Sequence, residues 1–413
     1  MINLLSRAGK FVGHFLTFWH FKRVMIFLVV DVIMLSFVRR RKSDIILVIR
    51  IDLLGDYVIG RKFLRMVRNY EPYRDKKIVM CANLHLKELI ETYDTDVFDD
   101  YIWVNRAGLL NEFRYRFKIL RQIKQLGARV AIHPMRDPYL GDCLMRATCA
   151  SERIGIESRL NPYAAPNEPG RVHTNLGDYF YTRMVPEDPG VTFEFDRNRR
   201  FFSAILPGVP LPDNMRLAPI PAPVPEIDGS FAIFMPGASD AFREWPPDRF
   251  AQVARHLFEA RKLRILVLGT RADSPKALAI QRAAPAVAVE DLCGQLTLPQ
   301  VVQLMSQCVV GVTNDSGGIH LLAALNKPGV AVSNCFSFGF FHPYPRELSD
   351  SVSFVYPPAF YALPLSMQQR KVVYGWGNKR FSIEEIPAKS VIERIEEILQ
   401  HRPFHDPVKE WSR

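Results

Sequence analysis

Residues 45–57 read IILVIRIDLLGDY, an apolar run that ends in a polar turn with one glycine and two acids. A short, continuous apolar run is typical of a strand that is buried on both faces of a parallel sheet. We therefore expect a strand at 45–50, a turn, and a helix near 57–69. This unit is the start of a βα alternation that decides the fold.

The same alternation extends along the chain on both sides of a proline-rich segment. Before that segment we expect strands at 45–50, 77–82, 101–104 and 128–133, with helices at 57–69, 85–93 and 110–126. After it we expect strands at 231–235, 263–268, 308–313 and 329–333, with helices at 247–261, 275–284, 298–307, 318–326 and 388–400. The pattern predicts an α/β protein with two Rossmann-like, doubly wound lobes.

The length agrees with two lobes, because 413 residues exceed one ordinary core. Seven prolines between Pro207 and Pro225 exclude a helix interior or a central strand, so this stretch is expected to be an extended connection. We divide the chain into an N-terminal segment, a first lobe, a linker, a second lobe, and a C-terminal helix with its tail. These parts span residues 1–42, 43–205, 206–230, 231–380 and 381–413.

The composition is that of a globular protein, with 48% hydrophobic and 23% charged residues. It excludes disordered, collagen-like and multi-spanning membrane proteins. The net charge of +11 is concentrated in residues 1–42, which hold eight of the 54 basic and one of the 43 acidic side chains. The rest of the chain is close to neutral, which argues against nucleic acid as a partner and favours an anionic membrane surface.

An apolar run of fifteen residues, 24–38, lies within this basic segment. As a helix it would reach about 22 Å, short of the roughly 30 Å hydrocarbon core. Asp31 lies at its centre, where burial in lipid is costly. We expect an interfacial or re-entrant anchor on the cytoplasmic leaflet of a membrane. The alternative is an amphipathic helix that packs on the protein's own surface.

Three polar loops follow strands, where ligands gather in doubly wound proteins. In the first loop, Gly55 allows a tight turn and Asp56 opens the next helix. A carboxylate there could act as a general base, but on local sequence alone an ordinary helix N-cap is the favoured interpretation.

The second loop, MPGASDAFREWP, follows the first strand of the second lobe. The small residues Gly237 and Ser239 let the backbone approach a ligand, and the planar guanidinium of Arg243 suits phosphate oxygens. The alternative is a surface loop in which Arg243 pairs with Glu244 or stacks on Trp245.

The third loop, TNDSGGIH, joins an apolar strand to a helix. Gly317 and Gly318 leave amides unpaired at the helix start, where the dipole favours an anion such as phosphate. Asp315 suits a sugar hydroxyl. The alternative is a simple capped turn in which His320 is a packed helical residue.

Signals for metal binding are weak. Asp94 and Asp96 could hold a divalent cation, but a solvated acidic turn is the preferred interpretation. The six cysteines form no CxxC pair and no zinc spacing, so we expect reduced thiols, no metal and no cofactor.

Together these loops resemble glycosyltransferase family nine, the heptosyltransferase-like enzymes of lipopolysaccharide assembly. The resemblance covers roughly residues 45–335. It rests on ILVIRIDLLGDYVI, FMPGASDAFREWPPDRFAQVARHL, ILVLGTRADSPKA and DLCGQLTLPQVVQLMSQCVVGVTNDSGGIHLLAAL. It implies a GT-B fold with the active site between the lobes, and metal-independent, inverting transfer of a sugar from a nucleotide donor to a lipid-linked glycan.

The resemblance also implies roles for single residues. Asp56 matches the proposed general base, and Arg243 stands where the family usually has a lysine that neutralises the departing diphosphate. The donor is expected to bind at Gly237, Ser239, Asp273, Asp315, Ser316, Gly317, Gly318 and His320, with Asp273 on the ribose. The acceptor is expected at His133, Arg136 and Asp137, which end a strand of the first lobe.

The sequence departs from the family after residue 332, where SNCF replaces the usual Phe-Gly turn, and the region beyond does not match. ADP-heptose is therefore one candidate donor, and another nucleotide sugar is a second. We predict a glycosyltransferase that is peripheral to the cytoplasmic face of the inner membrane. The alternatives are a non-catalytic nucleotide-sugar-binding protein and a GT-B-like epimerase.

Overall fold

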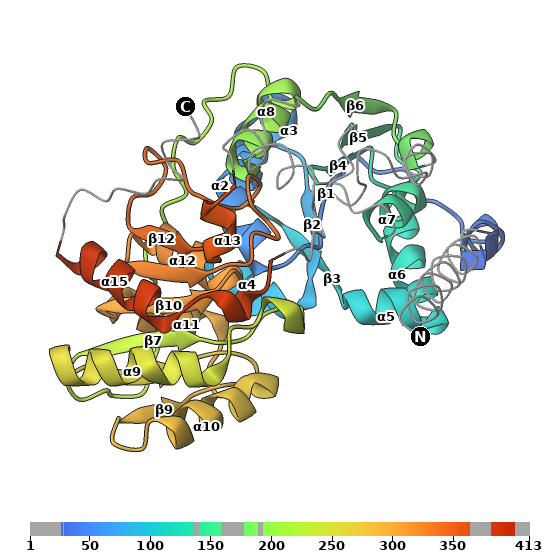
Figure 1. Ribbon diagram of the computed structural model, residues 1–413. Coiled ribbons are helices and arrows are strands. Elements are labelled where there is room, and N and C mark those ends of the chain that lie inside the picture. The colour runs from blue at the N-terminus through green and yellow to red at the C-terminus, as the bar shows by residue number, and fades with distance from the viewer. Residues whose placement is uncertain are drawn as a thin grey trace.

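A computed structural model describes residues 26–27, 29–135, 140–157, 177–188, 193–363 and 381–400 (Figure 1). These residues form two six-stranded sheets, and all strands within each sheet are parallel. Helices flank both sheets in Figure 1, with the first lobe in blue to green and the second in yellow to red. The predicted α/β class with two doubly wound lobes is confirmed.

The first sheet has the order β3-β2-β1-β4-β5-β6. Its strands are β1 (Ile46–Arg50), β2 (Ile78–Asn83), β3 (Asp100–Val104), β4 (Val130–His133), β5 (Glu152–Ile156) and β6 (Arg183–Val185). Its helices are α2 (Leu54–Asn69), α3 (Glu71–Arg74), α4 (Lys87–Tyr93), α5 (Arg106–Asn111), α6 (Phe113–Leu126), α7 (Leu140–Thr148) and α8 (Glu194–Ile205).

The second sheet has the order β12-β11-β10-β7-β8-β9. Its strands are β7 (Phe231–Met235), β8 (Arg264–Val267), β9 (Val289–Asp291), β10 (Val310–Asn314), β11 (Gly329–Val332) and β12 (Val352–Val355). Its helices are α9 (Pro247–Arg261), α10 (Ser274–Ala283), α11 (Leu298–Gln307), α12 (Gly317–Leu325), α13 (Pro358–Tyr361) and α15 (Ala388–Leu399).

The eight predicted strands are found within two residues of their expected bounds, because continuous apolar runs mark strands that are buried on both faces. All five residues of β1 are buried. Four strands were not predicted: β5, β6, β9 and β12. They lie at or next to the sheet margins, and three of them are three or four residues long, so their apolar patterns are weak.

One predicted helix, 110–126, is in fact two. Glu112 adopts an extended backbone conformation, which ends α5 and starts α6. The first helix of the chain also begins earlier than predicted, at Leu54 rather than residue 57.

The proline-rich segment contacts both lobes. The amide of Ile220 donates to the hydroxyl of Tyr93 in the first lobe at 3.2 Å. The amide of Leu217 donates to the carbonyl of Ala324 in the second lobe at 2.8 Å. The lobe boundaries at 43–205 and 231–380 stay a proposal. The last helix, α15, packs on α9 and on strands β11 and β12.

The N-terminal apolar run is helical over residues 29–36. Its central Asp31 is buried against the first lobe and forms ion pairs with Arg116 of α6 and Arg146 of α7, at 2.6 and 3.2 Å. This part of the segment therefore packs on the protein's own surface, which was the less favoured interpretation. Among the described residues, no helix has the length and apolar character needed to cross a bilayer.

The second lobe depends on Trp245, which is almost fully buried against Phe250 of α9. Its indole Nε1 donates to the carbonyl of Ile386 at 3.0 Å, just before α15. Trp245 therefore ties the loop after β7 to the C-terminal helix.

We expect Trp245→Ala to lower the free energy of unfolding by about 3–5 kcal/mol, because it opens a cavity and leaves the Ile386 carbonyl without its donor. Chemical denaturation measures this change. The control Phe113→Ala removes an aromatic ring that is 42% exposed and should stay within about 0.5 kcal/mol of the wild type. Equal losses in both variants would contradict the role given to Trp245.

Candidate active site

The strand orders place the candidate loops at the points where each sheet reverses direction. The first sheet reverses between β1 and β4, and the second between β7 and β10. The loop with Asp56 follows β1, the loop with Arg243 follows β7, and the loop with Ser316 follows β10. Ligands of open α/β sheets bind outside the carboxyl ends of the strands at such reversal points.

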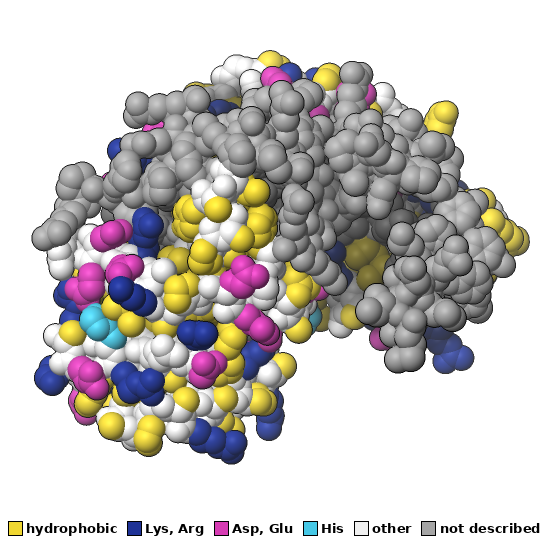
Figure 2. Space-filling model, in the orientation of Figure 1, with side chains coloured by type: hydrophobic (Ala, Val, Ile, Leu, Met, Phe, Trp, Pro, Cys, Tyr) yellow, Lys and Arg dark blue, Asp and Glu magenta, His cyan; other side chains and the backbone are white. Residues whose placement is uncertain are grey.

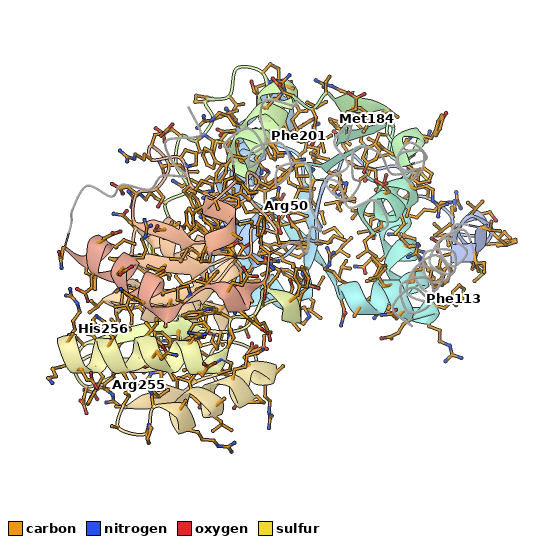
Figure 3. The ribbon with its side chains drawn as sticks, in the orientation of Figure 1. Arg50, Phe113, Met184, Phe201, Arg255 and His256 are labelled. Carbon is orange, nitrogen blue, oxygen red and sulfur yellow. The ribbon has the colours of Figure 1, made fainter. Side chains whose placement is uncertain are left out.

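A buried guanidinium forms the floor of the site in the first lobe. Arg50 ends β1, and its Nε lies 2.7 Å from Oδ2 of Asp52. Its Nη1 donates to Oδ1 of Asn198 at 2.9 Å, and its Nη2 donates to the carbonyl of Asp56 at 2.7 Å. Glu194 lies 3.9 Å away and accepts a hydrogen bond from Asn198. In Figure 3, Arg50 lies in the centre of the molecule, between the sheets of the two lobes.

Gly60 makes room for this guanidinium. A Cβ atom at Gly60 would come within 2.6 Å of Nη2 of Arg50. The sequence therefore needs both an arginine at the end of β1 and a glycine in the second turn of α2.

Asp56 lies in the first turn of α2, and its backbone carbonyl is the group that accepts from Arg50. Since α2 begins at Leu54 with Leu53 in the N-cap position, Asp56 is not an N-cap, and this alternative was wrong. Burial, and then the nearby carboxylates of Asp52 and Glu194, raise the pKa of Asp56 to about 8, although Arg50 opposes them. At neutral pH this carboxyl group is therefore mostly protonated, and the fraction that can accept a proton increases as the pH rises through about 8.

In the second lobe, Arg243 and Asp315 form an ion pair. Nη2 of Arg243 lies 3.1 Å from Oδ2 of Asp315 and also donates to its backbone carbonyl. Oδ2 of Asp315 further accepts from the hydroxyl of Ser337 at 2.8 Å and lies 3.2 Å from Nε2 of His342. Burial alone would raise the pKa of Asp315, but Arg243 and His342 outweigh it and hold that pKa well below its usual value.

These contacts differ from those that the sequence suggested for Arg243 and Asp315. Arg243 neither pairs with Glu244 nor stacks on Trp245 as its main contact; it holds Asp315 and lies over the ring of Phe336, 5.2 Å from the ring centroid. The carboxylate of Asp315 is used within the protein, and only 3% of its side chain is exposed.

The helix α12 starts at the same place. Its N-cap is Ser316, whose side chain makes no capping hydrogen bond among the described residues, and Gly317 and Gly318 fill the first turn. The preceding Asn314 ties this turn to the loop after β7: its Nδ2 donates to the carbonyl of Pro236 and its Oδ1 accepts from the amide of Trp245. The two loops of the second lobe are thus held as one unit.

The starts of α2 and α12 meet directly, which joins the two lobes. A Cβ atom at Gly55 would come within 2.5 Å of the ring of His320, and one at Gly317 within 2.9 Å of Leu54. A second contact lies nearby, where the amide of Glu194 in α8 donates to the carbonyl of Phe340 at 2.8 Å. The positive ends of two helix dipoles therefore converge beside Asp56.

His320 is part of this junction and is buried. Its Nδ1 lies 2.6 Å from the hydroxyl of Tyr344. Burial lowers the pKa of His320 to about 4, although Asp315 acts in the opposite direction. The imidazole is therefore neutral at physiological pH and can offer Nε2 as a hydrogen-bonding group.

Asp273 has a structural role in the second lobe. Its carboxylate accepts from the amide and hydroxyl of Thr270 and from Lys276, which lies 2.7 Å away. These hydrogen bonds hold its pKa below the usual value against the effect of burial. A Cβ atom at Gly237 would clash with this carboxylate at 2.4 Å, so Gly237 allows the loop after β7 to approach Asp273. Ser239 of that loop contacts Arg243 and Asp240.

The predicted acceptor residues are only partly described. His133 ends β4 and is 2% exposed, with its Nδ1 2.8 Å from the hydroxyl of Tyr181, which donates to Asp142. Arg136 and Asp137 lie outside the described residues. The assignment of His133, Arg136 and Asp137 to the acceptor stays a prediction.

The acidic turn at Asp94 is not a solvated loop, so that preference was wrong for Asp94. Its carboxylate is buried and binds Arg61, Arg65 and the hydroxyl of Tyr57, whereas Asp96 is exposed and pairs with Arg65. Among the described residues, no group of three or more histidine, cysteine or acidic side chains could hold a metal ion.

Several residues of the site were missed by the sequence reasoning. In the first lobe these are Asp52, Glu194 and Asn198, which surround Arg50. The acid two residues after Arg50 was a visible signal, but Glu194 and Asn198 lie more than 140 positions away. In the second lobe, Ser337, His342 and Tyr344 come from the region after residue 332 that was judged not to match.

The geometry defines a class of protein: two doubly wound lobes whose reversal points face one another. Comparison with solved structures confirms the GT-B fold. A glycosyl transferase family 9 protein from Veillonella parvula aligns with a TM-score of 0.62 at 18% identity, covering 88% of this chain and 99% of that one. The E. coli heptosyltransferase WaaC with ADP-2-deoxy-2-fluoro heptose aligns with a TM-score of 0.60 at 16% identity, covering 86% and 99%.

Sequence comparison finds family relatives for part of the chain. Residues 208–354 match the family model of glycosyltransferase family 9 (heptosyltransferase). Lipooligosaccharide heptosyltransferase 2 of Haemophilus influenzae is 33% identical over 103 residues, which are 24% of this chain and 30% of that protein. Lipopolysaccharide heptosyltransferase 2 of Escherichia coli is also 33% identical over 103 residues, 24% and 29% of the two chains. The matched region thus spans about a third of these curated relatives.

The resemblance inferred from the motifs is therefore confirmed, and residues 208–354 are the part of the chain that matches glycosyltransferase family 9. The matched residues extend to Phe354. They include Ser337, His342 and Tyr344, so the judgement that the region beyond residue 332 does not match the family was wrong up to that point.

We expect Gly55→Ala to force the lobes apart, because its methyl group would overlap the His320 ring. Small-angle X-ray scattering should show a larger radius of gyration. The double variant Gly55→Ala/His320→Ala removes the clashing ring and should restore the compact shape. If Gly55→Ala leaves the shape unchanged, the contact between α2 and α12 does not hold the lobes together.

We expect any proton-accepting activity of Asp56 to fall as the pH drops through about 8, because the protonated carboxyl cannot accept a proton. Asp52→Asn removes a neighbouring negative charge and should move the midpoint of the kcat/KM profile to lower pH. The control Asp248→Asn, in α9 of the second lobe, should leave it in place. An unchanged midpoint in Asp52→Asn would remove Asp52 from the electrostatics of Asp56.

Proposed function

We propose that the protein is an inverting glycosyltransferase that moves a heptose or similar sugar from a nucleotide-sugar donor to a lipopolysaccharide-core or other envelope glycan. One observation carries this proposal: a half-buried carboxyl group, Asp56, whose pKa is raised to about 8, lies where the starts of α2 and α12 meet. The family 9 domain in the second lobe supports the same reaction class.

In the proposed reaction, the carboxylate of Asp56 takes the proton of an acceptor hydroxyl. The acceptor oxygen then attacks the anomeric carbon of the donor from the side opposite the diphosphate. The bond between that carbon and the diphosphate oxygen breaks, and its electron pair leaves with the diphosphate. One displacement of this kind inverts the anomeric configuration.

The leaving diphosphate gains negative charge, and we propose that the second lobe binds and stabilises it. The amides of Ser316, Gly317 and Gly318 at the start of α12 are the proposed cradle, aided by the helix dipole. We propose that Arg243 stabilises the charge of the diphosphate less than a free cation would, because Asp315, 3.1 Å away, already balances its charge. Its second role is to hold the turn with Asp315 and Ser316 in position.

The donor is proposed to be a nucleotide-linked heptose, with another nucleotide sugar as the alternative. A solved relative, WaaC, contains an ADP-linked fluoroheptose. For this chain, Gly237, Ser239 and His320 stay proposed donor contacts. Asp273 is a weaker ribose ligand than the sequence suggested, since its carboxylate already binds Thr270 and Lys276.

Attachment to the cytoplasmic face of the inner membrane is part of the proposal. The acceptor is lipid-linked, and residues 1–42 are basic and apolar. A peripheral enzyme would keep Asp56 and the start of α12 close to that acceptor.

We expect Asp56→Asn to reduce kcat at least 10²-fold, because an amide cannot accept the proton. Release of nucleoside diphosphate is measured with ADP-heptose and a panel of other nucleotide sugars, with and without a lipopolysaccharide-core acceptor. The matched control Asp248→Asn should keep wild-type turnover. Full activity of Asp56→Asn would contradict its role as the base, and acceptor-independent isomerisation of the donor would favour an epimerase.

A stability measurement separates lost chemistry from lost folding. Between about pH 4 and 8 the folded protein keeps the proton of Asp56 while the unfolded chain releases it, so stability from this group declines as the pH rises. Asparagine does not titrate. We therefore expect the Tm of Asp56→Asn, relative to wild type, to increase from pH 5 to pH 8, and a flat difference would contradict the raised pKa.

A further inference from the structure

The helix at residues 29–36 has its polarity reversed relative to an ordinary surface helix. We define its outer face as Ile26, Val29, Val32, Ile33 and Phe37, which are between 52% and 83% exposed. The side turned to the first lobe carries the acid, Asp31, which is 3% exposed, and Leu35. Surface helices of water-exposed proteins place apolar residues inward and polar residues outward. This helix places its charge inward and presents apolar side chains to the outside.

The buried acid explains why the helix is held in this orientation. Arg116 of α6 donates to Asp31 through Nε and Nη2, at 3.0 and 2.6 Å, and Arg146 of α7 adds a third contact. Lys124 of α6 donates to the carbonyl of Leu35 at 2.7 Å. Turning the outer face inward would leave Asp31, Arg116 and Arg146 without these partners, and an unpaired buried charge is strongly unfavourable.

Further apolar and basic side chains lie on the neighbouring helices. Leu110 of α5 and Phe113 of α6 are 39% and 42% exposed, and Figure 3 shows Phe113 at the edge of the first lobe near the N-terminal helix. The exposed positions Arg114, Lys118 and Arg121 follow one stripe of α6 at helical spacing. Figure 2 shows yellow side chains at this margin of the molecule and Lys and Arg side chains below them.

The chain on both sides of the helix is basic as well. Arg39, Arg41 and Lys42 follow it and are exposed. Residues 1–25 contain four basic and no acidic side chains. Basic side chains around an apolar face complement the negative surface of a bilayer that contains anionic lipid.

We propose that the outer face, together with Leu110 and Phe113, is a docking surface for an anionic lipid bilayer, in which the helix lies in the plane of the interface. The ion pairs of Asp31 keep this helix on the first lobe while its outer face enters the lipid. The surface therefore attaches the lobe that carries Asp56. This deepens the membrane attachment proposed above, and it can hold whether or not the protein transfers a sugar.

The test is flotation of the full chain with vesicles of phosphatidylglycerol and phosphatidylethanolamine, compared with vesicles of phosphatidylcholine alone. The double variant Val29→Asp/Ile33→Asp places two charges on the outer face. We expect the wild type to float with the anionic vesicles and the variant to lose at least tenfold in bound fraction. The matched control Leu278→Asp changes an apolar residue of α10 that is 43% exposed and should float like the wild type.

Two further measurements make the result decisive. Thermal unfolding should give the same Tm for the double variant and the wild type, since both substituted side chains are exposed. Turnover with a delipidated, water-soluble acceptor should be unchanged in the double variant. If the wild type showed no turnover, this would contradict the proposed enzyme but would leave the docking proposal unaffected.

Three outcomes would overturn the docking proposal. The first is equal flotation of the wild type and the double variant. The second is a wild-type dimer in solution that the double variant converts to a monomer, which would assign the outer face to a second copy. The third is a wild type that floats only after residues 1–25 are deleted, which would mean that this segment covers the face.

Discussion

The buried guanidinium of Arg50 is the interaction on which the site depends. It joins the end of β1 to Asp52, to the backbone of Asp56 in α2, and to Asn198 in α8. A cation at this depth is stable only because acids and carbonyls surround it. Burial, and then those same acids, raise the pKa of Asp56. One arginine therefore fixes the position of the carboxyl group and takes part in the electrostatics that set its protonation.

The second lobe uses a buried ion pair for a different purpose. Arg243 and Asp315 neutralise one another and hold two loops together, so the positive potential at the start of α12 comes mainly from backbone amides. The contact of Gly55 with His320 then sets how closely this helix start approaches Asp56. Charge is thus compensated within each lobe at the place where the starts of α2 and α12 meet.

Asp31, at the edge of the first lobe, is a further buried charge that is balanced by ion pairs. A single unpaired acid in an apolar segment is unfavourable in lipid. Here Asp31 is paired with Arg116 and Arg146, and these ion pairs hold the helix on the first lobe while its apolar side stays exposed. The first lobe carries both Asp56, where the proposed enzyme acts, and the N-terminal helix, whose outer face is proposed to bind the bilayer.

The sequence by itself determined eight of the described strands and the loops that follow them, because buried parallel strands are continuous apolar runs and their polar ends are local in sequence. It located Asp56, Arg243 and Ser316 for that reason. Only the tertiary structure decided their partners. Glu194 and Asn198 reach Arg50 from a distant helix, Ser337 and His342 reach Asp315 from a segment without a strand pattern, and Asp31 meets Arg116 across 85 residues. Charges buried by distant parts of the chain leave no periodic signal, since their spacing follows the topology and not the local backbone.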